Sequence, residues 1–224
     1  YQFTDKILKC CTHAIDLHTG AIHRANLPQV RASAKDKTAL RMAEVFNAPV
    51  IIKAASRDGT MRGTANNLGI PLLLYEAGEA LRFDEQSIKI GVRGIVNVMQ
   101  DLGMLSGKTK APKNRSVFSK KSSWVRAEHD GIARYYVTLG QTVKTGDIMA
   151  HIYSPYSDFE VAIPATFDGV VIGRNNLPLV NEGEELFHVA EVSSLDEAEK
   201  TLDAISDEVD NAMPAALRDE YGVV

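Results

Sequence analysis

The sequence has few cysteines and no long hydrophobic run. Cys10 and Cys11 are the only cysteines among 224 residues, and as neighbours they lack a distant partner for a structural disulfide. No run of about 18 apolar residues and no signal-type segment is present. With 45% hydrophobic residues, a sizeable core is available. We therefore expect a soluble, cytoplasmic protein without a membrane partner, in which both thiols are buried and structural rather than catalytic.

Charge is unevenly distributed along the chain. From Glu191 to the end, ten acidic residues accompany two basic ones, although the formal net charge of the chain is only −4. A stretch without acidic residues contains Lys108, Lys110, Lys113, Arg115, Lys120, Lys121 and Arg126. Such a short basic run with few aromatic residues is more typical of a solvated linker than of a nucleic-acid site. We expect a basic linker over 107–122 and no nucleic-acid partner.

Short apolar segments alternate with helical periodicity over residues 1–106. The segments that predict strands are apolar and bounded by Gly or Pro, whereas the others repeat apolar residues every three or four positions. Strands are expected at 13–19, 48–56 and 70–78, and helices at 33–48 and 83–105. This order predicts an α/β domain with a mainly parallel sheet.

Residues 123–190 carry a different pattern of short strands and turns. Val143-x-x-Gly146 and Val180-x-x-Gly183 begin two similar segments, and each glycine can form a turn between strands. The repeat predicts a small all-β barrel-sandwich domain with internal pseudo-symmetry, which resembles biotinyl and lipoyl carrier domains. The corresponding hairpin tip, "YSPYSDFE", lacks the lysine that a carrier would need. We therefore expect the fold without the carrier chemistry.

The acidic tail, residues 191–224, has the signature of a C-terminal helix. Ser194 and Glu197 are spaced as in a capping box. The apolar residues that follow at spacings of three and four are Leu195, Ala198, Leu202, Ile205 and Val209. This stripe predicts a helix that docks on the body of the chain, with docking on a partner helix as the alternative.

The end of the first expected strand carries the first candidate site residues. Residues i and i+2 of a strand point the same way, so Asp16 and His18 share a face. That strand end is where ligands bind in open α/β sheets. A single histidine is more often structural than a metal ligand, but a carboxylate beside a metal-binding imidazole commonly fixes the orientation of its ring.

Three blocks of the sequence occur together in one known family. "IDLHTGAIHRANLPQVRA", "DGTMRGTANNLGIPLLLYEAGE" and the β-rich half resemble, from about Thr12 to Ala190, the succinylglutamate desuccinylase and aspartoacylase family of the zinc carboxypeptidase superfamily. The resemblance implies that residues 1–106 are the C-terminal part of an incomplete, zinc-carboxypeptidase-like α/β domain. It also implies one zinc ion held by two histidines and a glutamate. It places His18 as the last zinc ligand, Glu76 as the catalytic glutamate and Arg62 as the arginine that stabilises the reacting carbonyl oxygen.

The chain lacks the motif that supplies the other two zinc ligands in that family. An H-G-x-E type motif is expected upstream of His18, but the positions three residues after His13 and His23 hold Asp16 and Asn26. We therefore expect the C-terminal part of a longer protein, and this part alone should bind zinc weakly and turn over substrate poorly, because catalytic zinc needs about three protein ligands.

The implied reaction is zinc-dependent hydrolysis of the amide bond of a small N-acyl amino acid. Arg24, Asn26 and Arg31 are candidates for binding a substrate carboxylate, since the guanidinium fork matches its geometry, with salt bridges or loop anchoring as the alternative. Leu177 aligns with a tyrosine of aspartoacylase that contacts the acidic substrate, which weakens N-acetylaspartate as substrate. For bacterial relatives with an "NLPQVRA"-like stretch, the resemblance implies another possible substrate, an N-acetylated diamino acid such as N-acetyl-diaminobutyrate. The expected substrate is therefore an N-acyl amino acid that the sequence does not name further.

Two other interpretations remain open. The chain could be a non-catalytic binding or assembly module that forms homo-oligomers through the β domain or the C-terminal helix. Alternatively, it could be a metallocarboxypeptidase acting on peptides, although the β-rich half should narrow access to the site and so favour small substrates.

Overall fold

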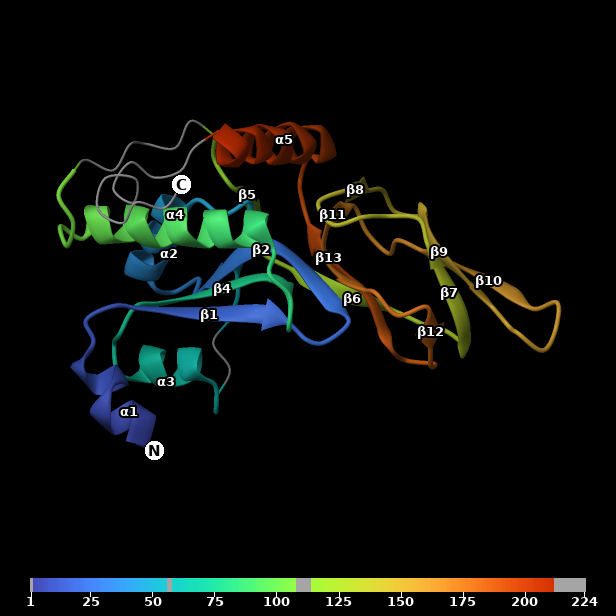
Figure 1. Cartoon of the computed structure of the whole chain (residues 1–224), viewed down its shortest axis with the longest axis horizontal. Helices are drawn as coiled ribbons and strands as arrows, with labels where there is room; N and C mark the ends of the chain where they lie inside the picture. Colours follow the sequence, from blue (N-terminus) through green and yellow to red (C-terminus); the bar gives the residue numbers. More distant parts are fainter. Residues whose placement is uncertain (1, 56–57, 108–113, 212–224) are drawn as a thin grey trace.

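The computed structural model describes residues 2–55, 58–107 and 114–211, which form a mixed α/β fold (Figure 1). The helices are α1 (Gln2–Lys6), a 3-10 turn at Leu8–Cys10, α2 (Lys37–Phe46), α3 (Met61–Asn67), α4 (Glu85–Asp101) and α5 (Leu195–Asn211). Among these helices, none combines the length and apolar character needed to cross a membrane.

The larger of two sheets in the described residues has nine strands and runs through both halves of the chain. Its central path has the order β1-β4-β2-β11-β13-β6, with β3 beside β2, β5 beside β3 and β8 beside β11. The strands are β1 (Ala14–Gly20), β2 (Arg24–Ala32), β3 (Val50–Lys53), β4 (Leu72–Glu79), β5 (Val117–Ser119), β6 (Ser122–Arg126), β8 (Thr142–Val143), β11 (Gly169–Asn175) and β13 (Glu185–Glu191). The pairs β1/β4, β2/β3 and β3/β5 are parallel, whereas β2/β4, β2/β11, β11/β13, β11/β8 and β13/β6 are antiparallel.

Strand β2 joins the two halves and was not predicted from the sequence. On one side it pairs with β4, and on the other it pairs first with β11 and then, from Gln29 onwards, with β3. The pairing with β4 shifts register between Asn26 and Gln29, next to Pro28, which has no backbone N–H to donate. Pro28 and the two charged side chains, Arg24 and Arg31, interrupt the apolar pattern by which a strand is predicted.

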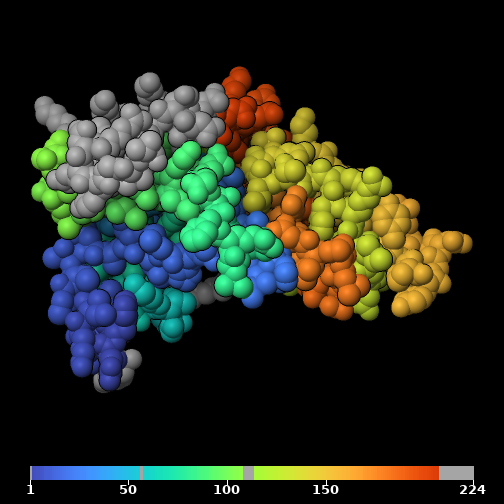
Figure 2. All heavy atoms as spheres, in the orientation of Figure 1, coloured from blue at the N-terminus to red at the C-terminus, as the bar shows by residue number. Residues whose placement is uncertain are grey.

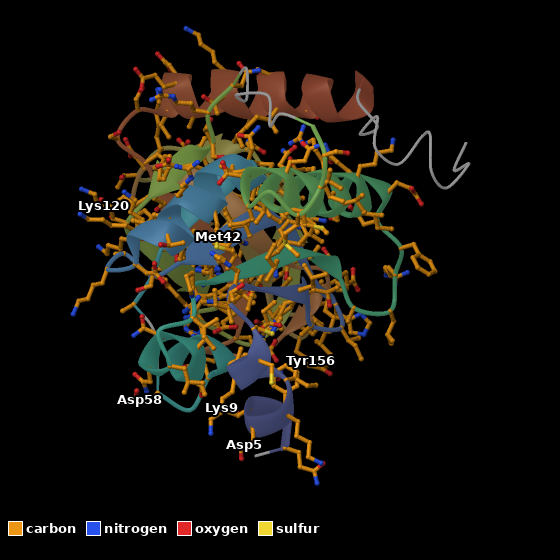
Figure 3. All side chains as sticks on the ribbon, turned by 90° about the vertical axis from the view of Figure 1, so that its left-hand side faces the viewer. Asp5, Lys9, Met42, Asp58, Lys120 and Tyr156 are labelled. Atoms are coloured by element: carbon orange, nitrogen blue, oxygen red, sulfur yellow. The ribbon has the colours of Figure 1, made fainter. Side chains whose placement is uncertain are left out.

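Helices cover both faces of the α/β part of the sheet. Helices α2 and α4 pack on one face, where Phe46 and Tyr75 lie in the same buried core (Figure 1). Met42 of α2 lies between this helical layer and the sheet (Figure 3). Helix α3 covers the opposite face, where Ala65 packs against Leu72 of β4. Alternate residues of β4 therefore belong to different layers.

The caps of α2 and α4 explain their limits. Asp36 accepts a hydrogen bond from the N–H of Ala39, and Asp84 accepts one from the N–H of Ser87, so each aspartate satisfies a free N–H of the first turn. Helix α2 ends at Asn47, which adopts the left-handed conformation typical of a C-terminal cap. Sequence analysis predicted both helices correctly from their apolar periodicity, without using these caps.

The second sheet is antiparallel and packs on the β-rich end of the first. Its strands, in the order β10-β9-β7-β12, are β10 (Glu160–Pro164), β9 (Ile148–Tyr153), β7 (Gly131–Tyr135) and β12 (Leu179–Val180). Ile152 of this sheet and Phe187 of the larger sheet share one buried core. The hairpin of β9 and β10 protrudes from the body at one end (Figure 2).

The two similar sequence segments form equivalent turns. Gly146 and Gly183 both have positive φ values, 91° and 82°, as the pattern predicted. The N–H of Gly146 donates to the carbonyl of Ala165 at 2.9 Å, and that of Gly183 donates to the carbonyl of Ala127 at 2.8 Å. The local structure therefore repeats along with the sequence.

Helix α5 docks on the chain's own body, as the apolar stripe predicted. The Ser194 hydroxyl accepts from the N–H of Glu197 at 3.3 Å, which caps the helix start. Ala198 belongs to a core shared with β3, β11 and β13, whereas Ile205 belongs to the core under α2 and α4. The helix thus bridges two cores.

Three expectations differ from the structure or fall outside it. Cys10 is exposed and Cys11 half-buried, so the prediction of buried thiols is wrong. The stretch 107–122, expected to be a linker, includes β5, which is bound to β3. The basic run at Lys108, Lys110 and Lys113, and the tail from residue 212, lie outside the described residues.

Candidate functional site

His18 and Glu76 lie side by side on one face of the sheet. They are paired residues of the adjacent parallel strands β1 and β4, and paired residues face the same side. Their neighbours Ile15 and Tyr75 point into the core under α2 and α4. Because side chains alternate along a strand, His18 and Glu76 point to the opposite face, which α3 partly covers.

The Glu76 carboxylate is held by two residues of β2. The Asn26 amide donates to Glu76 Oε2 at 2.8 Å, and the Arg31 Nε lies 3.8 Å from Glu76 Oε1. Both the Glu76 and the Arg31 side chains are 20% exposed, so the pair retains contact with solvent. An anionic oxygen in a largely buried position is stabilised by such donors, and this arrangement fixes the carboxylate toward β2.

His18 and Asp16 form a second pair on the same face. The His18 Nε2 lies 3.1 Å from Asp16 Oδ2, and half of the His18 side chain is exposed. Among the described residues there is no group of three His, Cys, Asp or Glu side chains that could hold a metal ion. Catalytic zinc needs about three protein ligands, so these residues do not fit a complete zinc site.

Arg62 lies in the first turn of α3, the helix that covers this face. The helix begins after Thr60, whose hydroxyl accepts from the N–H of Gly63. The Arg62 guanidinium donates to the carbonyl of Ala55 at 3.3 Å. Sequence analysis selected Arg62 by resemblance but did not predict α3, because its seven residues carry no clear apolar stripe.

Arg24, the third residue expected to bind a carboxylate, contacts the β-rich half. Its Nη1 is ion-paired with Glu185 Oε2, and Arg126 Nη2 lies 2.7 Å from the other Glu185 oxygen. The Arg24 guanidinium also lies over the Trp124 ring, 5.6 Å from its centroid. Asn26 and Arg31 therefore contact Glu76, whereas Arg24 links β2 to β13 and β6.

His188 and Trp124 were missed by the sequence analysis. His188 is buried on β13, and its ring stacks on Trp124 of β6 with centroids 4.6 Å apart and an interplanar angle of 15°. Its Nε2 lies 3.0 Å from the Ser122 hydroxyl. Burial, together with the nearby positive charge of Arg31, lowers the pKa of His188 to about 3. A lone histidine in the apolar run "ELFHVAE" was the signal that could have identified it.

A cavity of about 240 Å³ opens where β2, β4 and the start of α4 meet. Asn26, which holds Glu76, is among its lining residues, together with Gly78, Ser87 and Leu139. Phe83 stands at the cavity and is almost fully exposed. Asn26 therefore borders this cavity, whereas Glu76, which points to the face opposite α4, is not among its lining residues.

The fold is that of an α/β protein whose sheet continues into a β-rich half. One face of this sheet carries the polar side chains of His18 and Glu76. Residues 1–102 match the model of the succinylglutamate desuccinylase/aspartoacylase catalytic domain. The α/β part of this chain is therefore similar to the catalytic domain of the succinylglutamate desuccinylase/aspartoacylase family.

Individual relatives are consistent with this similarity. A protein of Halomonas elongata named N-alpha-acetyl-L-2,4-diaminobutyric acid deacetylase is 27% identical over 202 residues, which are 85% of this chain and 59% of the relative. The apo structure of the ectoine utilization protein EutE (DoeB) from Ruegeria pomeroyi has a TM-score of 0.78 at 24% identity, covering 85% of this chain and 64% of that one. A succinylglutamate desuccinylase/aspartoacylase from Rhodobacter sphaeroides has a TM-score of 0.76 at 21% identity, covering 86% and 62%. The chain thus spans less than two thirds of each of these proteins.

Proposed function

We propose that this chain carries part of the active site of a deacylase that hydrolyses the amide bond of a small N-acyl amino acid. The products would be a carboxylate and a free amine. The observation that carries the proposal is the pairing of His18 and Glu76 on one sheet face, with Glu76 held by Asn26 and Arg31. The relative named as a diaminobutyric acid deacetylase supports this reaction class and favours an N-acetylated diamino acid as substrate.

Each side chain of the site has a separate role in the proposed reaction. Glu76 would take a proton from the attacking water and pass it to the leaving amine, for which its 20% exposure leaves room. Arg31 would bind the substrate carboxylate, since its guanidinium has donors beyond the one facing Glu76. Arg62, on the helix over this face, would stabilise the developing oxyanion, a contribution of roughly 3 kcal/mol when a donor is well placed.

His18 would be one ligand of a zinc ion, with Asp16 fixing the orientation of its ring. About two further protein ligands would be needed, and the described residues do not provide them. The role that we assign to Glu76 rests on its own contacts.

The proposal is tested by measuring amine release from N-acetyl-L-2,4-diaminobutyrate, N-acetylaspartate and N-succinylglutamate, with zinc present and the chain in excess. Glu76→Gln should lower the rate at least 100-fold, since a positioned acid–base group contributes about 100-fold or more. Glu191→Gln, a change of the same type at the far end of β13, should leave the rate unchanged. Equal rates in Glu76→Gln and wild type, or hydrolysis of esters or peptides alone, would refute the proposal.

A further inference from the structure

We propose that Trp124 and His188 form a wall of the binding site that selects the amino-acid part of the substrate. This inference rests on the proposed deacylase function and extends it to residues that neither the family resemblance nor the candidate site included. It assigns to these two residues a role in binding, not in bond cleavage.

Five paired positions form a single row across the sheet. Gly78 of β4 pairs with Asn26 of β2, Asn26 with Gly173 of β11, Gly173 with His188 of β13, and His188 with Trp124 of β6. From Asn26 to Trp124 the paired residues share a face, and the Asn26 amide donates to Glu76 Oε2 at 2.8 Å. The row therefore leads from the strand of Glu76 to Trp124.

Gly173 brings the members of this row together. A Cβ atom at this position would lie 3.0 Å from the Cβ of His188, 3.1 Å from Asn26 Oδ1 and 3.4 Å from Trp124 Cη2. Trp124 therefore reaches back across β13, over the bare Gly173, and approaches the residue that holds Glu76. The aromatic pair adjoins the candidate site although its strands lie further along the sheet.

The spacing of the strands suits a small substrate. Neighbouring strands lie about 4.8 Å apart, so Gly173 is roughly 10 Å from the strand of Glu76. An N-acyl amino acid has the backbone length of about two residues, roughly 7 Å. A substrate with its amide at Glu76 would therefore direct its amino-acid part across β2, toward the edge of Trp124.

The charges around this path favour an anionic group. The buried Nε of Arg31 has no hydrogen-bond partner within the described parts of the chain, and its ion pair with Glu76 is long, at 3.8 Å. Arg24 lies over the Trp124 ring, but its charge is paired with Glu185, so Arg31 is the guanidinium that this path offers to a carboxylate. The buried His188 is neutral near pH 7, so it supplies an apolar surface without competing for the carboxylate. The expected ligands are N-acyl α-amino acids with one free carboxylate.

Trp124 is the single tryptophan of the chain, so its fluorescence reports on this wall directly. The chain is titrated with N-acetyl-L-2,4-diaminobutyrate and with N-acetylglycine, which lacks a side chain, while calorimetry measures the two dissociation constants. We expect a saturable change in Trp124 emission with the diaminobutyrate ligand. We also expect Trp124→Leu to change the ratio of the two constants at least fivefold, mainly through the ligand that has a side chain.

Two further variants distinguish a change in binding from a loss of folding. Gly173→Ala adds one methyl group between Asn26 and His188 and should change the same ratio while keeping the aromatic pair. Ser123→Ala, at an exposed position on the opposite side of β6 from Trp124, should leave the ratio and the emission change as in wild type. Circular dichroism checks that each variant is folded.

The outcomes separate this inference from the proposed function. Three outcomes would overturn the inference. The first is constant Trp124 emission while calorimetry shows saturation, and the second is an unchanged ratio of the two dissociation constants in folded Trp124→Leu and Gly173→Ala. The third is no binding of either ligand. Hydrolysis that depends on Glu76 could still stand in the first two cases. Conversely, selective binding at Trp124 without any hydrolysis would support the binding role of Trp124 and His188 and refute the proposed deacylase function.

Discussion

The buried imidazole of His188 should make the fold sensitive to acid. Its pKa is about 3 in the folded chain, against 6.5 for an ordinary histidine, chiefly because burial disfavours the charged ring. Between these values the unfolded chain binds a proton that the folded chain does not. The free energy of unfolding therefore falls as the pH decreases from about 6.5 toward 3.

The expected magnitude follows from the two pKa values. Between pH 7 and pH 4.5, the proton taken up by the unfolded chain at this one site lowers the free energy of unfolding by about 2.5 kcal/mol. His188→Gln removes the titrating group while an amide can still contact the Ser122 hydroxyl. At pH 7 the variant should be somewhat less stable than wild type. Between pH 7 and pH 4.5 its free energy of unfolding should fall by about 2.5 kcal/mol less than that of wild type.

Urea unfolding at pH 7, 5.5 and 4.5, followed by circular dichroism, provides the test. Carboxylates with lowered pKa values, such as Asp101 and Glu79, also weaken the fold in acid, but they are present in both proteins and cancel in the difference. Parallel plots of stability against pH for His188→Gln and wild type would show that His188 titrates normally. They would refute our account of its burial.

Three further substitutions probe the α4 layer through urea or thermal unfolding. Gly94→Ala would place a Cβ 2.4 Å from the Phe46 ring and should cost about 1–3 kcal/mol; an unchanged midpoint would show that α2 and α4 pack less closely than described. Tyr75→Phe removes the donor to the Ser87 carbonyl, a bond of 2.7 Å, and should cost about 1–2 kcal/mol. Asp84→Ala removes the cap of α4 and should cost about 1 kcal/mol, most of which Asp84→Asn should restore.

Local signals explain which elements could be predicted. The helices over 33–48 and 83–105 and the strands around His18 and Glu76 were identified because periodicity, caps and apolar runs lie within each segment. Strand β2 was not predicted, because Pro28 and its charged residues break the alternating pattern of a strand. It is nevertheless central in the sheet. Its partners β4 and β11 come from both halves of the chain, a relation that no local window contains.

The candidate site was likewise predictable only where its geometry depends on local sequence. The side-by-side placement of His18 and Glu76 could be predicted because both stand near the ends of strands in a parallel pair. The contact of Asn26 with Glu76 depends on the register shift in β2, which only the structure reveals. The roles of these residues in catalysis stay predictions until the variants are measured.

The shared sheet makes the α/β part and the β-rich half parts of one hydrogen-bonded structure. A division after residue 106 was expected from composition, but Asn26 of β2 is paired with Gly173 of β11. Ile52 of β3 and Ile172 of β11 are buried in one core with Ala198 of α5. Backbone hydrogen bonds and apolar burial therefore both cross the expected boundary. Because β2 also carries the two residues that hold Glu76, changes in the β-rich half should reach the candidate site through the register of this strand.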